Sequence, residues 1–283
     1  MAEFGIAAPS VKVAGVKSAT ATGKALSVVA LRKTYGDVVA VDEASMEIAA
    51  GEFVTFLGSS GSGKTTTLMM IAGFCEPDSG TITVGGRDVT RLAPQKTGPR
   101  FRLPAVPAVP HMTVAENVAF PLTLRGVPKD EIRRRVGETL EIAGLSGFGG
   151  RKPRELSGGQ QQRVALCRAL VYRPPVILMD EPLGALDKKL RDQLQVEIKT
   201  IQQELGLTVI YVTHDQEEAL VMSDRIAVMR NGLIEQFDTP ASCSSGRGRR
   251  SWRTSSARRT SCPGVSSSTT ASTPWSVSTT VVT

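Results

Sequence analysis

The sequence predicts an α/β fold for residues 26–240, and three observations support this prediction. Strand-like and helix-like segments alternate along the whole stretch. The apolar run Phe53–Leu57 leads into a loop rich in Gly and Ser and then into an apolar helix. A second apolar run, VILM, ends in the acidic pair Asp180 and Glu181. Alternation of this kind is typical of an α/β domain.

The segments on either side of this stretch lack the pattern. Residues before Leu26 are mostly small or polar, and about half of the residues from Ala241 onward are Ser or Thr. We therefore predict a disordered N-terminal extension over residues 1–25 and a disordered tail over residues 241–283.

The charge is concentrated in the tail. Its six Arg residues and lack of acids account for six units of the formal net charge of +7, which leaves +1 for the rest of the chain. A nearly neutral body gives no sign of a nucleic-acid surface, so we expect no direct nucleic-acid binding. The chain has no run of eighteen apolar residues and no signal peptide, which predicts a cytoplasmic location. Four scattered cysteines predict free or buried thiols.

The loop after Phe53–Leu57 reads GSSGSGKTT and fits the pattern G-x-x-x-x-G-K-[ST] between a strand and a helix. Glycines let the backbone N–H groups curl around phosphate oxygens, and the helix N-terminus adds its positive dipole. Lys64 is expected to reach the β- and γ-phosphates, and the Thr65 hydroxyl to ligate Mg²⁺. The alternative is a linker that happens to precede a lysine. The predicted phosphate-binding residues are Gly58, Ser59, Ser60, Gly61, Ser62, Gly63, Lys64, Thr65 and Thr66.

Two strand ends supply candidate catalytic groups. Asp180 is placed to hold Mg²⁺ through water, and Glu181 is the candidate general base that polarises the attacking water. The later strand TVIYVT ends just before His214. Because parallel strands end on one edge of a sheet, we expect His214 to lie beside the γ-phosphate as a hydrogen-bonding sensor. The alternatives are a solvated strand end and a structural surface histidine.

The segment ELSGGQQQRVALCRAL places Ser157 and Gly159 before a helix expected to run to about Tyr172, where the helix N-terminus forms a second anion site. A phosphate loop, this segment, Asp180-Glu181, the stretch Leu183–Asp187 and a late histidine follow in one order. In these motifs the chain from about residue 26 to 240 resembles the ATP-binding cassette (ABC) ATPases. The resemblance implies a P-loop NTPase (RecA-like) core, an antiparallel β subdomain, and an α-helical signature subdomain at about residues 97–172.

The resemblance also implies ATP and Mg²⁺ as cofactors and a head-to-tail pair of cassettes, either a homodimer or a pair with another cassette. Each ATP then lies between the phosphate loop of one subunit and the signature of the other. Asp187 belongs to the loop exchanged across that pair. Tyr35 matches the aromatic residue that stacks on adenine, with a packed edge aromatic as the alternative. The signature residues of this chain are Ser157, Gly158, Gly159 and Gln160.

Such a cassette could either power a membrane importer or work as a soluble ATPase on nucleic acid or ribosomes. Soluble ABC ATPases that act on nucleic acid or ribosomes typically carry two cassettes or a long coiled coil, which this sequence lacks, and a P-loop kinase would lack the signature. HMTVAENVAFPLTLRGVPKDEIRRRV resembles the region that meets the permease in bacterial importers of polyamines, iron, sulfate and sugars. We therefore expect ATP hydrolysis coupled to transport, with permease subunits and a solute-binding protein as partners, on the inner face of the cell membrane. GALDKKLRDQLQVEIKTIQ favours the spermidine/putrescine branch.

Four prolines fall between Thr97 and Pro110, where the family has a strand that ends in a Mg²⁺-binding glutamine. Reading the degenerate codons one base later permits a family-like segment with glutamine at the position of Pro104. A shifted frame from Ala241 likewise permits the start of a C-terminal regulatory β-domain. We hypothesise a compensated frameshift at about 97–110 and an uncorrected one near 241. The alternative, a genuine Pro-rich loop and tail, gives a cassette that binds ATP without driving transport.

Overall fold

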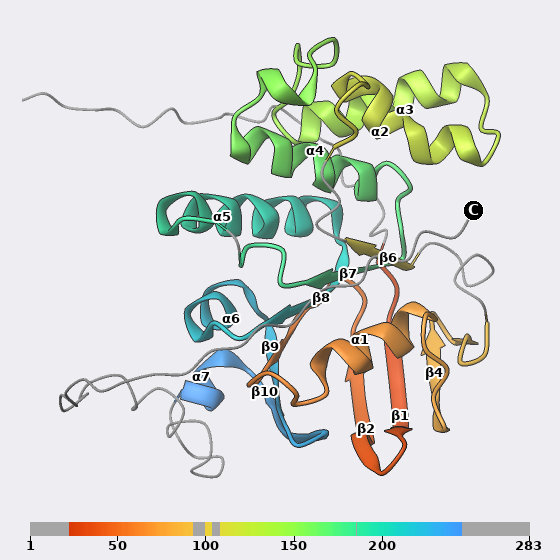
Figure 1. The fold of residues 1–283 in the computed structure, drawn as a ribbon, viewed down its shortest axis with the longest axis vertical. Helices are drawn as coiled ribbons and strands as arrows, with labels where there is room; N and C mark the ends of the chain where they lie inside the picture. The colour runs from red at the N-terminus through yellow and green to blue at the C-terminus, as the bar shows by residue number, and fades with distance from the viewer. Residues whose placement is uncertain (1–22, 93–99, 104–107, 185, 245–283) are drawn as a thin grey trace, which may run out of the picture. The chain divides into compact units, whose positions relative to one another are not determined.

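The computed structural model describes residues 23–92, 100–103, 108–184 and 186–244, and for residues 100–103 it describes the backbone only. Within them, a six-stranded sheet has the order β10-β9-β3-β8-β7-β6 (Figure 1). Five of its strands are parallel, and β10 is antiparallel to β9. The strands are β3 (Phe53–Leu57), β6 (Arg100–Leu103), β7 (Val176–Asp180), β8 (Thr208–Thr213), β9 (Arg225–Arg230) and β10 (Leu233–Asp238).

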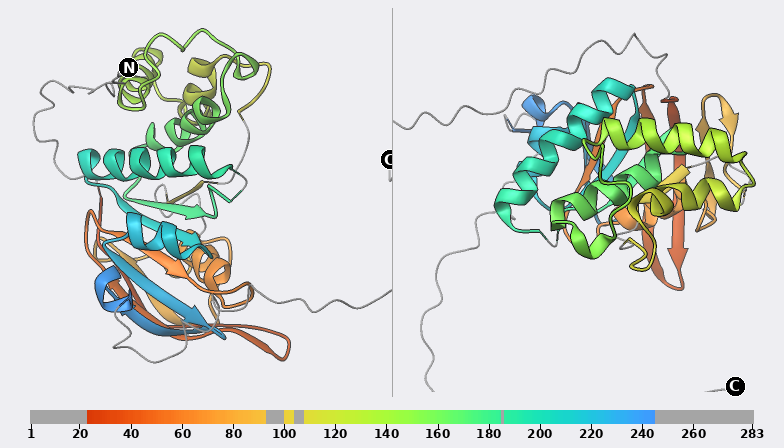
Figure 2. Two further views of the ribbon diagram at one scale, coloured as in Figure 1. Left: turned by 90° about the vertical axis from the view of Figure 1, so that its left-hand side faces the viewer. Right: turned by 90° about the horizontal axis from the view of Figure 1, so that it is seen from above.

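A second sheet of the described chain is antiparallel throughout and has the order β2-β1-β4-β5. Its strand β2 lies next to β10, and its long strands form the lower part of the view in Figure 2, left. This sheet is the predicted antiparallel β subdomain. Its strands are β1 (Leu26–Tyr35), β2 (Val38–Ile48), β4 (Ser79–Val84) and β5 (Arg87–Asp88).

The six-stranded sheet is buried on both faces because alternate residues of its strands enter two different cores. Val54 and Phe56 pack with α1 (Lys64–Ala72) and the antiparallel sheet, whereas Phe53 packs with α5 (Lys188–Leu205) and Met222 of α6 (Gln216–Met222). Continuous apolar strands of this kind suit a sheet covered on both sides. The apolar side chains that recur at helical spacing along α5 are buried or partly buried, and Gly206 ends that helix in the left-handed conformation (φ 57°).

The helices of the predicted signature subdomain form a third core, separate from the two beside the sheet. They are α2 (Val114–Leu124), α3 (Lys129–Ile142), the 3-10 turn η1 (Pro153–Glu155) and α4 (Gly158–Leu170). This subdomain was expected to span about residues 97–172. Arg100–Leu103 instead pairs in parallel with β7 as an edge strand of the six-stranded sheet. An edge position tolerates prolines next to the strand.

The end of the described chain also differs from the prediction. The cassette continues past Pro240 into α7 (Pro240–Ser244), whose first position suits proline, and Cys243 is buried in a small core with Leu57 and Ile226. The hairpin β9–β10 turns at Asn231 and Gly232, both with positive φ, which is typical of an Asn-Gly turn. Cys75, Cys167 and Cys243 are free thiols. None of the helices that the structure describes is long and apolar enough to cross a membrane.

The predicted extension (residues 1–25) and the predicted tail (residues 241–283) lie mostly outside the described residues, as do Pro104 and Ala185. Gly23 is within them, and its N–H donates to the carbonyl of Gly206 (3.0 Å).

Candidate active site

The phosphate loop joins the end of β3 to the start of α1 and depends on glycine geometry. Gly61 and Gly63 have φ values of 79° and 99°, a region that disfavours residues with a Cβ. A Cβ at Gly63 would also lie 2.6 Å from the carbonyl oxygen of Ala40, a contact that backbone atoms cannot relieve. The loop therefore requires glycine at Gly63 for two independent reasons.

Lys64, the first residue of α1, points its ammonium into the loop. Its Nζ donates to the carbonyl oxygens of Gly58 (2.7 Å) and Ser59 (2.8 Å), and only 6% of the residue is exposed. Burial lowers the pKa of Lys64, while the carboxylates of Glu181 and Asp180 act in the opposite direction. The buried Ser62 hydroxyl has no hydrogen-bond partner within the described chain. A cation and an unpaired hydroxyl in a loop of this type fit a phosphate group.

Thr65 and Asp180 meet across the sheet edge. The Thr65 hydroxyl donates to Oδ1 of Asp180 (3.3 Å), which joins the first turn of α1 to the end of β7. A hydroxyl and a carboxylate at this distance are the hard oxygen ligands that Mg²⁺ prefers, and Mg²⁺ commonly takes further ligands from phosphate and water. The two residues predicted as metal ligands are thus brought together.

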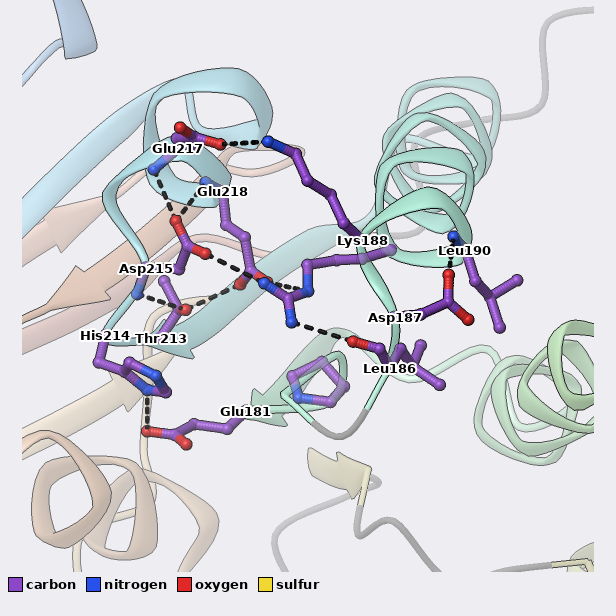
Figure 3. Close-up of polar contacts among 12 residues, drawn as sticks. Glu181, Leu186, Asp187, Lys188, Leu190, Thr213, His214, Asp215, Glu217 and Glu218 are labelled. Atoms are coloured by element: carbon purple, nitrogen blue, oxygen red, sulfur yellow. Dashed lines mark hydrogen bonds and ion pairs between the residues drawn. The ribbon is translucent and has the colours of Figure 1, made fainter.

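Glu181 and His214 also lie together. His214 Nδ1 is 3.2 Å from Oε1 of Glu181, and both side chains remain partly open to solvent (Figure 3). The backbone of Glu181 has φ 46°, unusual for a residue with a side chain, and its N–H donates to the carbonyl of Val212 (3.0 Å). Left-handed backbone at such a residue costs about 1–3 kcal/mol and is common at functional sites.

The signature residues cap α4. The Ser157 hydroxyl accepts from the Gln160 N–H (3.3 Å) and the Gln160 side chain accepts from the Ser157 N–H (3.0 Å), a reciprocal capping box. A Cβ at Gly159 would lie 2.9 Å from Cδ1 of Leu190 on α5. Among the described residues, no hydrogen bond or ion pair joins Ser157–Gln160 to the phosphate loop of the same chain. Figure 1 shows α4 and α1 in different parts of the cassette.

Asp187, expected in the exchanged loop, lies at a helix start, and Tyr35, expected to stack on adenine, lies at a strand end. Asp187 caps α5 by accepting from the N–H of Leu190 (2.9 Å). Tyr35 ends β1, is 54% exposed, and has its hydroxyl 3.2 Å from the sulfur of Cys75. Its ring is therefore anchored at one end while much of its surface remains open.

Sequence reasoning missed three charged residues near His214: Arg191, Asp215 and Glu218. Arg191 forms ion pairs with both carboxylates, and Glu218 is only 3% exposed. The available signal was the run of acids in HDQEE, which is typical of a solvated helix start. The sequence alone does not show that the last of these acids, Glu218, faces inward.

The fold and this site define a class of protein: a nucleotide-binding α/β cassette with a phosphate loop, an acidic strand end and a separate capped helix that carries a second anion site. The ABC transporter sequence model matches residues 41–184. The chain therefore belongs to the ABC transporter family, and its described part is an ATP-binding cassette.

Solved structures and curated relatives agree with this assignment. A dimeric post-hydrolysis structure of the ATP-binding cassette MJ0796, bound to ADP and Pi, matches with a TM-score of 0.64 and 33% identity, over 76% of this chain and 98% of that chain. CbiO1 from Clostridium perfringens, part of the ABC transporter complex cbiONQ, matches with a TM-score of 0.71 and 28% identity, over 79% and 91%.

Two relatives in sequence share one name, spermidine/putrescine import ATP-binding protein PotA. The protein from Rubrobacter xylanophilus is 57% identical over 74% of this chain and 55% of its own length. The protein from Thermobifida fusca is 56% identical over 77% and 58%. The chain thus spans little more than half the length of these relatives.

We predict that Gly63→Ala weakens ATP binding at least about tenfold more than Gly61→Ala. A tenfold difference in Kd corresponds to roughly 1.4 kcal/mol of binding free energy. Both substitutions place a Cβ on a left-handed residue, but only the one at Gly63 meets the Ala40 carbonyl, since nothing lies within 4 Å at Gly61. Titration with a fluorescent ATP analogue measures the difference. Equal losses in the two variants would contradict the steric argument.

Proposed function

We propose that this chain hydrolyses ATP to energise solute import through a membrane permease. The observation that carries the proposal is that Lys64, Thr65, Asp180, Glu181 and His214 gather at one edge of the parallel sheet. Two pairs among them are in contact, Thr65 with Asp180 and Glu181 with His214. A cation for phosphate, two oxygen ligands, a base and a hydrogen-bonding sensor are the groups that phosphoryl transfer to water requires.

Each group then has a role. The backbone N–H groups of Gly58–Thr66 and the Lys64 ammonium bind and orient the phosphates. Thr65 and Asp180 would hold Mg²⁺, which supplies charge neutralisation on the phosphate oxygens when bound. Glu181 orients and polarises the attacking water, and His214 donates a hydrogen bond near the γ-phosphate. Tyr35 offers its ring face to adenine.

A pair of cassettes completes this site. The N–H groups at the start of α4 form an anion site that the chain's own phosphate loop does not contact in the described residues. Supplied by a partner cassette head to tail, the Ser157–Gln160 segment would cover the phosphates from the opposite side. Asp187 would lie in the loop exchanged between the two subunits. The dimeric MJ0796 cassette supports pairing of this kind.

The proposed cargo is a polyamine, spermidine or putrescine, and the support is the name shared by the two relatives above. We propose that the chain works on the cytoplasmic face of the membrane with permease subunits and a solute-binding protein. The ATPase subunit does not touch the solute in this family, so the assignment rests on sequence similarity over about three-quarters of this chain and not on a solute-binding residue.

Hydrolysis is tested with Glu181→Gln. Removing the base should lower ATP turnover by at least about 100-fold while ATP binding is retained and the cassette pair is stabilised, because general-base catalysis contributes roughly 10²–10⁴-fold. Glu217→Gln is the matched control, since Glu217 is exposed and pairs only loosely with Lys188 (3.8 Å). Undiminished turnover in Glu181→Gln would remove Glu181 from the role of base.

Cargo is tested by uptake. Cells that lack their own polyamine-import ATPase, but retain the permease and the binding protein, should regain uptake of labelled spermidine when supplied with this chain in its family-like reading frame. Uptake should depend on Lys64. Restored import of a sugar and not of spermidine would assign the chain to another importer.

The reading-frame proposal is tested on the encoding DNA. We expect single-base insertions or deletions across codons 95–114 and near codon 241, which would place a glutamine at position 104. Confirmation of the recorded frame would show that the prolines are real. The chain should then bind ATP with poor transport-coupled hydrolysis, and vigorous stimulation of this same chain by a permease would contradict that expectation.

A further inference from the structure

Arg191, in the first turn of α5, holds two segments that flank the active site. Its Nη2 donates to the carbonyl oxygen of Leu186 (3.0 Å), and its Nη1 donates to Oδ2 of Asp215 (3.2 Å). Figure 3 labels both acceptors, Leu186 just before α5 and Asp215 at the start of α6. The side chain is about three-quarters buried, so its bonds are formed away from bulk water.

The third partner of Arg191 is a buried carboxylate. Oε1 of Glu218 lies 3.7 Å from Nε of Arg191, and Oε2 accepts from the hydroxyls of Tyr211 (2.8 Å) and Thr213 (2.7 Å). Burial, reinforced by the carboxylate of Glu218, raises the pKa of Tyr211. A carboxylate with 3% exposure is stable only when it is paired and hydrogen-bonded, and Arg191 supplies the positive charge.

These contacts fix the residues on both sides of His214. The Thr213 hydroxyl donates to Glu218 and accepts from the N–H of Asp215 (3.0 Å), while the Asp215 carboxylate caps α6 by accepting from Glu217 N–H (2.8 Å). Asp215 is also bonded to Arg191. His214 therefore extends toward Glu181 from a backbone that is held before and after it.

The Leu186 carbonyl connects the same guanidinium to a second functional segment. Leu186 directly precedes Asp187, the cap of α5, in the loop that we propose is exchanged between cassettes. One planar, charged group thus bonds to the end of this loop and to the segment that carries His214. If this loop moves, the Leu186 carbonyl moves with it and its hydrogen bond to Nη2 of Arg191 changes. The hydrogen bond from Nη1 to Asp215 then carries that change to the segment around His214.

We propose that Arg191 is a positioning residue for ATP hydrolysis: it sets His214 against Glu181 and ties that geometry to the Leu186–Asp187 end of the exchanged loop. The inference rests on the proposed function. Arg191 contacts neither Lys64 nor Thr65 in the structure, so its effect passes through His214 and not through nucleotide binding.

The test uses Arg191→Lys, which keeps the charge but cannot direct the two rigidly spaced Nη donors at Leu186 and Asp215 together. We expect turnover to fall about 10- to 100-fold, in the range of a misplaced catalytic group, with the Kd for ATP unchanged within about twofold. The matched control is Lys188→Arg, the reverse exchange in the same helical turn. Lys188 makes only an exposed ion pair with Glu217, so this substitution should leave turnover unchanged. If Arg191→Lys fails to fold, Glu218→Gln tests the same network.

A double-mutant cycle separates positioning from general destabilisation. If Arg191 acts through His214, adding Arg191→Lys to His214→Ala should cost little further turnover, because the positioned group is already absent. Losses that multiply in the double variant would overturn the proposal.

A second readout does not depend on hydrolysis. The chain has two histidines, and His111 lies outside this network, so the two imidazole signals in NMR report the site and an internal control. Arg191→Lys should shift the His214 signals and leave those of His111 in place, whereas Lys188→Arg should shift neither. Unmoved His214 signals would overturn the inference even if the wild type hydrolyses ATP. A shift in a chain without turnover would uphold the positioning and contradict only the proposed function.

Discussion

Parallel pairing of β3, β8 and β7 is the constraint on which the rest of the site depends. Leu57 pairs with Thr213, and Asp180 pairs with Val212, so the three strands finish within one residue of each other. The next residues along the chain are Gly58, His214 and Glu181, which therefore start from one edge of the sheet. A slip of one residue in either pairing would turn the strand's buried side chains to the opposite face and separate these groups.

The same pairing stabilises features that are unfavourable by themselves. Glu181 has left-handed backbone, and Lys64 is a buried cation, each of which costs free energy locally. The two apolar cores on either side of the sheet hold the strand ends in place, and the Glu181 N–H extends the β7–β8 pairing through Val212. The strained backbone of Glu181 and the buried charge of Lys64 thus both lie at the proposed phosphate site, where rigid strands hold them in place.

The predictable parts of the molecule were those with local signals. The run Phe53–Leu57 and the turn Asn231-Gly232 follow from apolar pattern and glycine chemistry, and the phosphate loop follows from its spacing. The residues Arg100–Leu103 do not themselves predict a strand in the sheet, because their pairing partner lies more than seventy residues away and prolines surround them. Only the resemblance to the family implied a strand in this place. The Arg191 network was missed for a similar reason, since its partners approach one another only through the packing of α5 and α6.

Side-chain contacts connect the start of α4 to the segment that follows Glu181 and to α5. The Gln162 side chain donates to the carbonyl of Pro182 (2.7 Å), the residue after Glu181, and Arg163 makes a two-pronged pair with Glu197 on α5. Gly159 packs against Leu190 on α5, where a side chain would collide. The signature end of α4 is therefore fixed on the same helix and loop that carry Asp187 and follow Glu181. Because a partner's phosphates would bind at that end, a displacement of α4 on nucleotide binding would be transmitted to Pro182 and hence to the base of its own site.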